Sequence, residues 1–526
     1  MALLQDLIPD PTTKDLWQCR PAATSLVKFT SSGFSSGFSI GFGGGGFNLP
    51  TFVSCMKVVG SRVYGMVSTS RNPGQDEPFC YDLVATTFVP ITGVTAANTP
   101  LSPSTGGAWN PPNIDLIGRK LIVSHPGFTG AGNGYFGVID ITAPAAPVWS
   151  SGNTTVNALV APPQWVQNFN GRCFFLVNPA GAQPAVYMSD QLNPTVITNA
   201  NQILTFGDNI PLTCAAGLPL QSQLGGIVQA LMVFKGVSNI FQVTGDYSLS
   251  NLATNALNVA TGTLGPNTVV ATSKGLGFIA PDGLRVIDFN ARVSDPIGHT
   301  GDGAGVTTPF INAVVPSRMS AAYNSGVYRV QVNNGATGTQ QQWWYDFVRQ
   351  IWSGPHTQQA SLMAPYAGTF IVTLQAGEAQ LFQSDSVQST ASSFVENGVP
   401  LSWVWATPML PDTDEMAQIA IIETTLHMAL VAGSTVTVSA QDQNGAYLDQ
   451  VSVTPAGAST LWGAFNWGAA PWQGALNALF PKQLLWHFPL VFQRMGVTAR
   501  GLSAAGIKIG RLHLRYQVLG YLQQGT

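Results

Sequence analysis

The sequence predicts an all-β protein, and two features of its composition and pattern lead to this prediction. Glycine (56 residues) and proline (35) are abundant among the 526 residues, which is typical of short strands separated by turns. No stretch repeats apolar residues at the 3.6-residue period of an amphipathic helix for more than about two turns. We therefore expect strands to form both the core and most of the surface.

A recurring apolar strand indicates how these strands are organised between residues 51 and 394. Successive strands begin between 42 residues apart (Val327 to Thr369) and 57 residues apart (Val63 to Lys120), which is the period of propeller blades rather than of solenoid turns. A four-stranded blade buries its two faces only against neighbouring blades, so the array must close into a ring. We predict a β-propeller of six or seven blades, since the irregular first repeat could share strands with the last. The recurring strands begin at Val63, Lys120, Cys173, Ala230, Leu276, Val327 and Thr369.

The aromatic stretch from Gln341 to Gly354 is the clearest example of one repeat. In an extended chain, Trp343, Tyr345 and Phe347 would line one face, and Trp344, Asp346 and Val348 the other. We predict that Asp346 caps the following turn and that Trp352 starts the returning strand. Similar runs that end in aspartate begin at Cys80, Tyr135, Val186 and Gly283.

Residues 1–50 precede the repeats and are predicted to form an arm and a loop. Residues 31–50 place four phenylalanines between glycines and serines, and glycine allows backbone conformations that are closed to other residues. Two interpretations remain open: the phenylalanines pack into the nearest core, or they form an adhesive loop that contacts a partner. The four are Phe34, Phe38, Phe42 and Phe47.

The pattern changes after residue 395, where six longer strands are predicted within residues 395–526. Their lengths and spacing favour a C-terminal β-sandwich. Between them, Trp462, Trp467 and Trp472 recur every five residues, which is the period of neither a helix nor a strand. We expect these three side chains either to fill the end of the sandwich or to form an intersubunit contact.

The charge composition limits the possible partners. Only 9% of the residues are charged, against about 25% in an average soluble domain. A surface so poor in charge favours self-association. The net charge of −3 and the dispersed 22 basic residues argue against a protein that grips nucleic-acid phosphates.

The sequence indicates folding in a reducing cytoplasm. It has no apolar run of signal-peptide length at its start and no uninterrupted apolar run long enough to span a membrane, so no membrane insertion is expected. Its cysteines show neither a CxxC pair nor a repeated spacing, which predicts buried free thiols. They are Cys19, Cys55, Cys80, Cys173 and Cys214.

The sequence contains no recognisable catalytic, cofactor or metal motif. There is no phosphate-binding GxxxxGK[ST], and the glycines of residues 41–47 lack the lysine that such a loop needs. The acidic run at residues 411–416 is better explained as a solvated turn than as a calcium site. We therefore expect no enzyme activity, no cofactor and no metal. The isolated histidines are His125, His299, His356, His427, His487 and His513.

Several of these segments together resemble the nozzle proteins of short-tailed bacteriophages, also called tail-hub or packaged-DNA-stabilisation proteins. They are the YDF…W hairpin, the arm DLWQCRPA, the units SNIFQVTGD and GFIAPDGLRVI, and the segment WGAFNWGAAPW. The resemblance covers about residues 10 to 400 and, more loosely, the C-terminal region. The YD…W unit also resembles kelch repeats, although the paired glycines of that family are mostly missing.

The resemblance to nozzle proteins implies a structural component of the virion tail, made in the host bacterial cytoplasm. It implies a homohexamer beneath the adaptor ring, the head-to-tail connector, which carries a tail needle or fibres. It also implies that genomic DNA passes through a channel without specific binding, and weakly charged walls would suit such a passage. The alternative is a carbohydrate-binding propeller of a receptor-binding tail protein or lectin, with exposed Trp and Tyr beside Asp and Asn.

Overall fold

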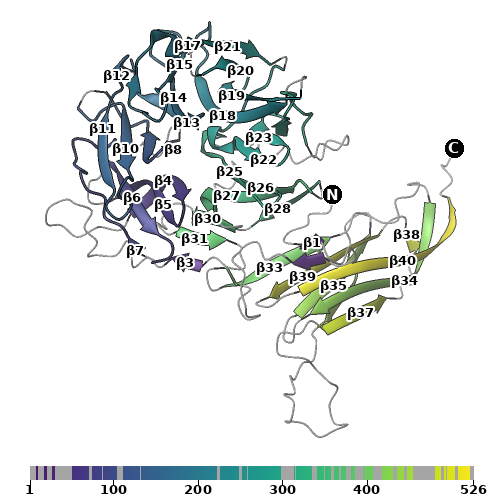
Figure 1. Cartoon of the computed structure of the whole chain (residues 1–526). Coiled ribbons are helices and arrows are strands. Elements are labelled where there is room, and N and C mark those ends of the chain that lie inside the picture. The colour runs from purple at the N-terminus through teal and green to yellow at the C-terminus, as the bar shows by residue number, and fades with distance from the viewer. Residues whose placement is uncertain are drawn as a thin grey trace. The chain divides into compact units, whose positions relative to one another are not determined.

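The computed structural model confirms an all-β chain that contains a propeller (Figure 1). Residues 28–352 and 359–382 form one compact unit, and residues 1–27, 353–358 and 383–526 form a second. The structure describes residues 7–9, 17–19, 27–29, 50–69, 74–85, 87–102, 111–130, 132–221, 225–247, 251–257, 259–297, 313, 316–333, 340–348, 350–356, 360–366, 369–374, 381–384, 395–396, 399–406, 417–430, 435–442, 447–453, 480–486, 491–492, 495–503 and 507–521.

Seven antiparallel sheets, counted over the described residues, follow one another along the first unit and form its blades. Blade 1 comprises β4 (Pro50–Val59), β5 (Arg62–Thr69), β6 (Asp76–Asp82) and β7 (Thr87–Phe88), and blade 2 comprises β8 (Asn113–Ile117), β9 (Lys120–Ser124), β10 (Phe136–Asp140) and β11 (Val148–Gly152). Blade 3 comprises β13 (Pro163–Phe169), β14 (Arg172–Val177), β15 (Ala185–Met188) and β17 (Ile203–Thr205), and blade 4 comprises β18 (Leu212–Gln221), β19 (Ile227–Lys235), β20 (Asn239–Asp246) and β21 (Asn251–Ala256).

The remaining three blades complete the ring. Blade 5 comprises β22 (Val270–Thr272), β23 (Gly275–Ala280) and β24 (Gly283–Ile287), and blade 6 comprises β25 (Ser320–Asn324), β26 (Val327–Asn333), β27 (Gln340–Asp346) and β28 (Ile351–His356). Blade 7 comprises β29 (Ala360–Tyr366), β30 (Thr369–Leu374), β31 (Leu381–Ser384) and β3 (Val27–Phe29). Short additional elements are the pair β12 (Thr155–Val156) and β16 (Val196–Ile197), and the 3₁₀ turns η2 (Ala200–Gln202), η3 (Pro266–Thr268) and η4 (Pro316–Arg318).

The first strands of the blades surround the centre of the ring. β4, β8, β13, β18, β22, β25 and β29 each contact the first strand of the next blade, and β29 contacts β4. The predicted recurring strands are the second strands of the sheets, namely β5, β9, β14, β19, β23, β26 and β30. The predicted period of the repeats is therefore confirmed, and it was set by the second strand of each blade.

The ring is closed by the segment that was predicted to be an arm. β3 is the outer strand of blade 7, although it precedes blade 1 in the sequence. We expected the first and last repeats to share strands. Instead, blade 1 has four strands of its own, and the last blade is completed by β3, which precedes blade 1 in the sequence. β3 thus supplies the fourth strand of blade 7.

The aromatic repeat has the predicted hairpin, with one correction. Trp343, Trp344, Tyr345 and Phe347 are buried in β27 and the turn that follows it. Val348 was predicted to lie on the same face as Trp344, but it is 80% exposed because the strand ends at Asp346 and the chain turns there.

A buried cation covers the second face of this hairpin. The guanidinium carbon of Arg329 in β26 lies 3.8 Å from the ring centroid of Trp344 and 4.3 Å from that of Phe370 in β30. A guanidinium stacks favourably on aromatic faces, so this arginine joins blades 6 and 7.

The described residues of the second unit form two sheets. One follows the order β1 (Leu7–Pro9), β2 (Trp17–Cys19), β40 (Ile507–Tyr521), β34 (Ala417–Leu430) and β37 (Phe480–Trp486), with β38 (Val491–Phe492) also paired to β34. The other follows the order β32 (Val395–Glu396), β33 (Val399–Ala406), β39 (Met495–Ser503), β35 (Thr435–Asp442) and β36 (Tyr447–Val453). Five of the six predicted strands are present. The one predicted over residues 488–500 divides into β38 and β39, which belong to different sheets, and β37 was missed. That the two sheets pack as a sandwich stays a prediction.

Candidate functional site

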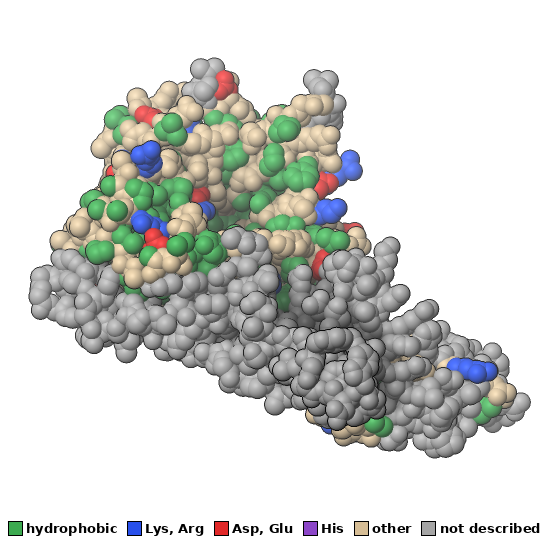
Figure 2. Space-filling view, turned by 60° about the horizontal axis from the view of Figure 1, so that its bottom comes forward, with side chains coloured by type: hydrophobic (Ala, Val, Ile, Leu, Met, Phe, Trp, Pro, Cys, Tyr) green, Lys and Arg blue, Asp and Glu red, His purple; other side chains and the backbone are tan. Residues whose placement is uncertain are grey.

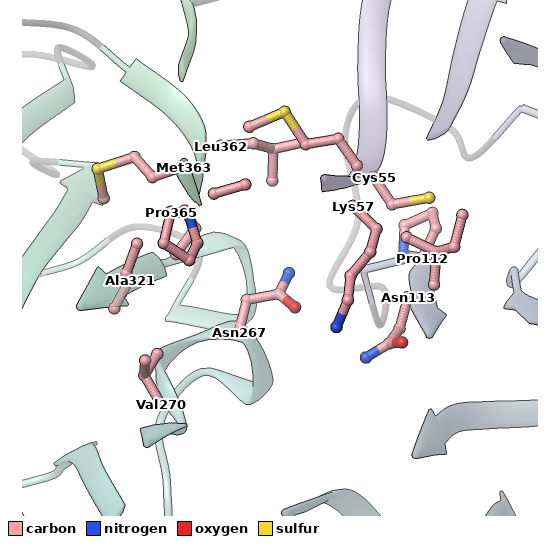
Figure 3. Close-up of a pocket in the computed structure, with 15 residues that line it drawn as sticks. Cys55, Lys57, Pro112, Asn113, Asn267, Val270, Ala321, Leu362, Met363 and Pro365 are labelled. Carbon is pink, nitrogen blue, oxygen red and sulfur yellow. The ribbon is translucent and has the colours of Figure 1, made fainter. Parts of the chain in front are cut away.

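The centre of the propeller holds a pocket of about 240 Å³. Its walls come from the first strands of blades 1, 2, 5, 6 and 7 and from the turns that lead into them (Figure 3). The pocket therefore exists only when the ring is closed. Its lining residues are Cys55, Met56, Lys57, Pro112, Asn113, Ile114, Asn267, Val270, Ser320, Ala321, Ala322, Leu362, Met363, Ala364 and Pro365.

An ion pair at the pocket wall joins three blades. Lys57 Nζ in β4 lies 2.9 Å from Asp115 Oδ1 in β8, and the backbone N–H of Leu116 donates to the same oxygen. The other oxygen, Oδ2, accepts from Gln167 Nε2 at 3.2 Å and from the backbone N–H of Asn168 at 2.6 Å, both in β13. Asp115 therefore has a donor for each oxygen and ties blades 1, 2 and 3 together at the hub.

Four polar side chains from four different blades line the pocket. Lys57, Asn113 and Asn267 point toward a common space in Figure 3, and Ser320 belongs to β25. The Oδ1 atom of Asn113 and the Oγ atom of Ser320 are buried and have no hydrogen-bond partner in the protein. The rest of the lining is mostly aliphatic.

The one thiol in this lining is not poised for nucleophilic chemistry. Cys55 is fully buried, and this burial raises the pKa of its thiol well above the usual range. Because the thiolate is the reactive form, a protonated Cys55 serves as a small apolar side chain. Cys80, Cys173 and Cys214 are likewise free and buried, as predicted, and burial raises the pKa of Cys80 to about 11. The side chain of Cys19 lies outside the described residues.

A second group of polar residues lies inside the wall between blades 1 and 2. His125 Nε2 lies 2.9 Å from Asp76 Oδ2, and Ser102 Oγ donates to the other oxygen of Asp76. The backbone N–H of Gly127 donates to His125 Nδ1, so the ring proton is on Nε2 and points to Asp76. In a hydrolase triad the histidine lies between the serine and the acid, whereas here Asp76 lies between them. Since His125 and Asp76 are both buried, this group links blades and is not set up for catalysis.

The residues that could coordinate a metal do not gather. In the part of the chain that the structure describes, no three His, Cys, Asp or Glu side chains lie close enough to hold one ion. Likewise, none of its helices is long and apolar enough to cross a membrane.

The exterior of the propeller carries few charges. On the face shown in Figure 2, hydrophobic and uncharged side chains dominate, and Lys, Arg, Asp and Glu occur singly or in small groups. Aliphatic side chains are exposed on several blades: Val84, Val148, Val156, Val160, Leu192, Ile227, Val237 and Val348. These exposed positions are scattered singly over the described residues, which is ordinary for the surface of a folded protein.

The predicted contact residues lie outside the described part of the chain. This applies to Phe34, Phe38, Phe42 and Phe47, and to Trp462, Trp467 and Trp472. The hub residues were not predicted, because no motif surrounds Lys57 or Asn267. The available signal was a lysine inside the apolar run FVSCMKVV and an aspartate inside NIDLI, since a charge within a covered strand calls for a partner.

Comparison with known proteins finds similar solved structures but no family. No protein-family model matches the chain, and no curated protein sequence matches it. The chain is similar to a puromycin hydrolase at 11% identity and a TM-score of 0.37, over 68% of this chain and 58% of that one. It is similar to BamB from Moraxella catarrhalis at 10% identity and a TM-score of 0.35, over 74% of this chain and 98% of that one. It is also similar to the β-propeller domain of the Trilobed protease from Pyrococcus furiosus, at 8% identity and a TM-score of 0.30, over 64% and 96% of the two chains.

Proposed function

We propose that the protein is a structural component of a bacteriophage tail, which assembles as a homohexameric nozzle below the adaptor ring. In this role it carries no enzyme activity. It retains the genome and then lets it leave, and it holds a needle or fibres at its free end. The observation that carries the proposal is a closed, sparsely charged propeller whose exterior exposes aliphatic side chains on several blades.

The volume of the hub pocket bears on whether DNA could pass through a single propeller. The hub pocket has a volume of about 240 Å³, which is the size of a small-molecule pocket rather than of a channel for DNA. A DNA duplex, whose major groove alone is about 12 Å wide, does not fit there. The passage in this proposal therefore lies between copies of the chain, and the propellers form part of its wall.

The low charge supports the same arrangement. Each phosphate contact made by a lysine or arginine would add salt-dependent affinity and slow a polyanion that must slide. Neighbouring subunits also pack more easily when few unpaired ions are buried between them. A chain in which only 9% of the residues are charged is compatible with both requirements.

The expected result is a hexamer. Mass spectrometry of the full chain under native conditions should give six times 55.5 kDa, or the chain should enter particles only after the adaptor ring is in place. A stable monomer at high concentration, together with particles that lack the protein in their tails, would rule the proposal out.

The alternative is a carbohydrate-binding propeller with exposed aromatic side chains. Among the described residues, the exposed large apolar side chains are aliphatic, apart from Phe289. This distribution supports subunit packing more than stacking on sugar rings, which uses aromatic faces. A monomer that binds glycans in an array would favour the alternative.

A further inference from the structure

A groove of about 540 Å³ opens where two neighbouring strands of blade 4 separate beside blade 3. β19 and β20 pair with each other only over Leu231–Lys235 and Asn239–Val243. Beyond these residues β19 stays paired with β18, and β20 stays paired with β21. The blade-4 groove lies between the separated ends, and β19 and β20 line it with Ile227, Val228, Gln229, Gly245 and Asp246.

The register of the sheet shows which backbone groups of β19 face this groove. Gln221 in β18 lies opposite Ile227, but its N–H donates to the carbonyl of Phe289 at 2.6 Å, away from β19. Hydrogen-bonded and non-bonded pairs alternate along an antiparallel ladder, so Pro219 and Gln229 also form a non-bonded pair, which suits a proline without an N–H. The N–H and C=O groups of Ile227 and Gln229 therefore point away from β18 and toward the groove.

The same alternation orients β20. The carbonyl of Ile240 accepts from the N–H of Leu257 at 2.9 Å, on the side of β21. Gly245 lies an odd number of positions further along, so its N–H and C=O groups point to the opposite side, toward the groove. Ile227 and Gly245 are exposed, and none of the described strands pairs with these two edges. The regularly spaced groups of an open strand edge are matched by the backbone of another strand.

A buried arginine of blade 3 adds a charge to the groove. Arg172 lines it and is only 8% exposed, and its Nη1 atom donates to the carbonyl of Ser189 at 2.8 Å. Its Nε and Nη2 atoms have no partner among the described residues and are not completely covered. Asp190 directs both carboxylate oxygens to other side chains and backbone groups, and no described carboxylate forms an ion pair with Arg172. Asp246, the other charged residue of the lining, already has an interaction within the protein.

We propose that the blade-4 groove binds an extended segment of a partner polypeptide, which pairs with the edge of β19 and places an acidic side chain at Arg172. The backbone of the segment supplies the acceptors and donors that Ile227 and Gln229 lack. A carboxylate matches the forked donors of a guanidinium better than a neutral acceptor does. This proposal does not depend on the role of the protein in a virion.

The test is fluorescence anisotropy on the full chain with two labelled heptapeptides of alternating threonine and valine, blocked at both ends. One carries a central glutamate and the other a central glutamine. We expect the glutamate peptide to bind and the glutamine peptide to bind about fivefold to tenfold more weakly, the difference between a charged and a neutral hydrogen bond. In Arg172→Met the two peptides should bind with equal affinity, because the guanidinium that distinguishes them is gone.

A second variant tests the strand edge and serves if Arg172→Met does not fold. Ile227 is the first residue of β19, where proline is tolerated, and its N–H is not used by β18. Ile227→Pro should therefore melt as a folded chain in circular dichroism but bind both peptides at least about tenfold more weakly. Ile227→Ala is the matched control, because it shortens the same side chain and keeps the N–H, so it should weaken binding less.

Three results would overturn the proposal. The first is that neither peptide binds at concentrations up to about 1 mM. The second is that the preference for glutamate survives in Arg172→Met, which would place the carboxylate elsewhere. The third is that Ile227→Pro and Ile227→Ala have equal effects on binding, which would show that the backbone of β19 is not the contact.

Discussion

Aspartates at the ends of the third strands cap the turns of several blades. Asp82 Oδ1 accepts the backbone N–H of Val84 at 3.0 Å, and Asp140 Oδ1 accepts that of Thr142 at 2.8 Å. Asp288 and Asp346 accept from the residues two positions on, Asn290 and Val348, in the same way. The predicted cap at Asp346 is confirmed. Asp190 differs, because it accepts from Thr198 and Gln202 across a longer loop.

These caps should make the propeller sensitive to acid. The backbone N–H of Ala85 and the side chain of Arg62 hold the pKa of Asp82 below its usual value, and hydrogen bonds from Thr142 lower the pKa of Asp140. A lowered pKa in the folded state gives stability that is present above the unfolded value, about 3.9, and is lost as the pH falls through the folded value.

Two variants of Asp82 separate the charge from the hydrogen bonds. Asp82→Asn keeps an acceptor oxygen but cannot be protonated in this range, so its unfolding midpoint in urea should fall less than that of the unmodified chain between pH 5 and the acid limit. Asp82→Ala loses the cap and should cost about 1 kcal/mol at neutral pH. An Asp82→Asn chain with an unchanged acid response would contradict the assignment.

A glycine under Trp149 is required for packing in blade 2. A Cβ atom at Gly137 would lie 2.0 Å from the indole ring of Trp149, which is buried and donates to the carbonyl of Asn98. Gly137→Ala should destabilise the fold by about 1–3 kcal/mol, because the ring must leave its position. Gly152→Ala is the control, since nothing lies within 4 Å of a Cβ atom there. Equal unfolding midpoints for the two variants in denaturant would disprove this explanation.

At the scale of elements, the closing strand β3 has a larger effect than its three residues suggest. It completes blade 7, and its loss would expose the edge of β31. An exposed edge pairs readily with other chains, and a blade of three strands covers less of its neighbours. Through β3, a segment near the beginning of the chain is therefore joined to blade 7, the last blade of the propeller.

Two truncations test this closure and differ only in β3. Removing residues 1–26 deletes β1 and β2, whereas removing residues 1–29 deletes β3 as well. The shorter chain should unfold roughly 5 °C or more lower in calorimetry, since each kcal/mol shifts the midpoint by about 2–4 °C in large domains. Identical melting temperatures for the two truncations would show that β3 does not hold the ring closed.

At the scale of the whole molecule, low charge sets how copies should associate. With 9% charged residues, contacts between subunits should be mainly apolar and uncharged polar. The proposed hexamer should therefore persist in sedimentation velocity between about 0.1 M and 1 M salt, where the Debye length falls from about 10 to 3 Å. Dissociation into monomers on raising the salt would instead indicate an assembly held by ion pairs.

Much of the propeller could be predicted from local patterns. The period of the apolar strands, the aspartate caps and the aromatic hairpin each depend on residues within one repeat, and their hydrogen bonds and alternation leave a trace in the sequence. Five of the six longer strands predicted for the second unit were found in the same way, whereas the run predicted over residues 488–500 divides into β38 and β39. β37 was missed, because its residues continue a tryptophan-rich segment without alternation.

The sequence by itself determined an all-β chain, a repeated blade and the turns within it, because those depend on neighbours only a few residues apart. Only the tertiary structure decided that β3 completes blade 7 and that β1 and β2 pair with β40, since these strands meet partners hundreds of residues away. The hub pocket also depends on residues that are far apart in the sequence. Lys57, Asn267 and Ser320 share it because seven sheets close into a ring, and such long-range proximity leaves no period in a single chain.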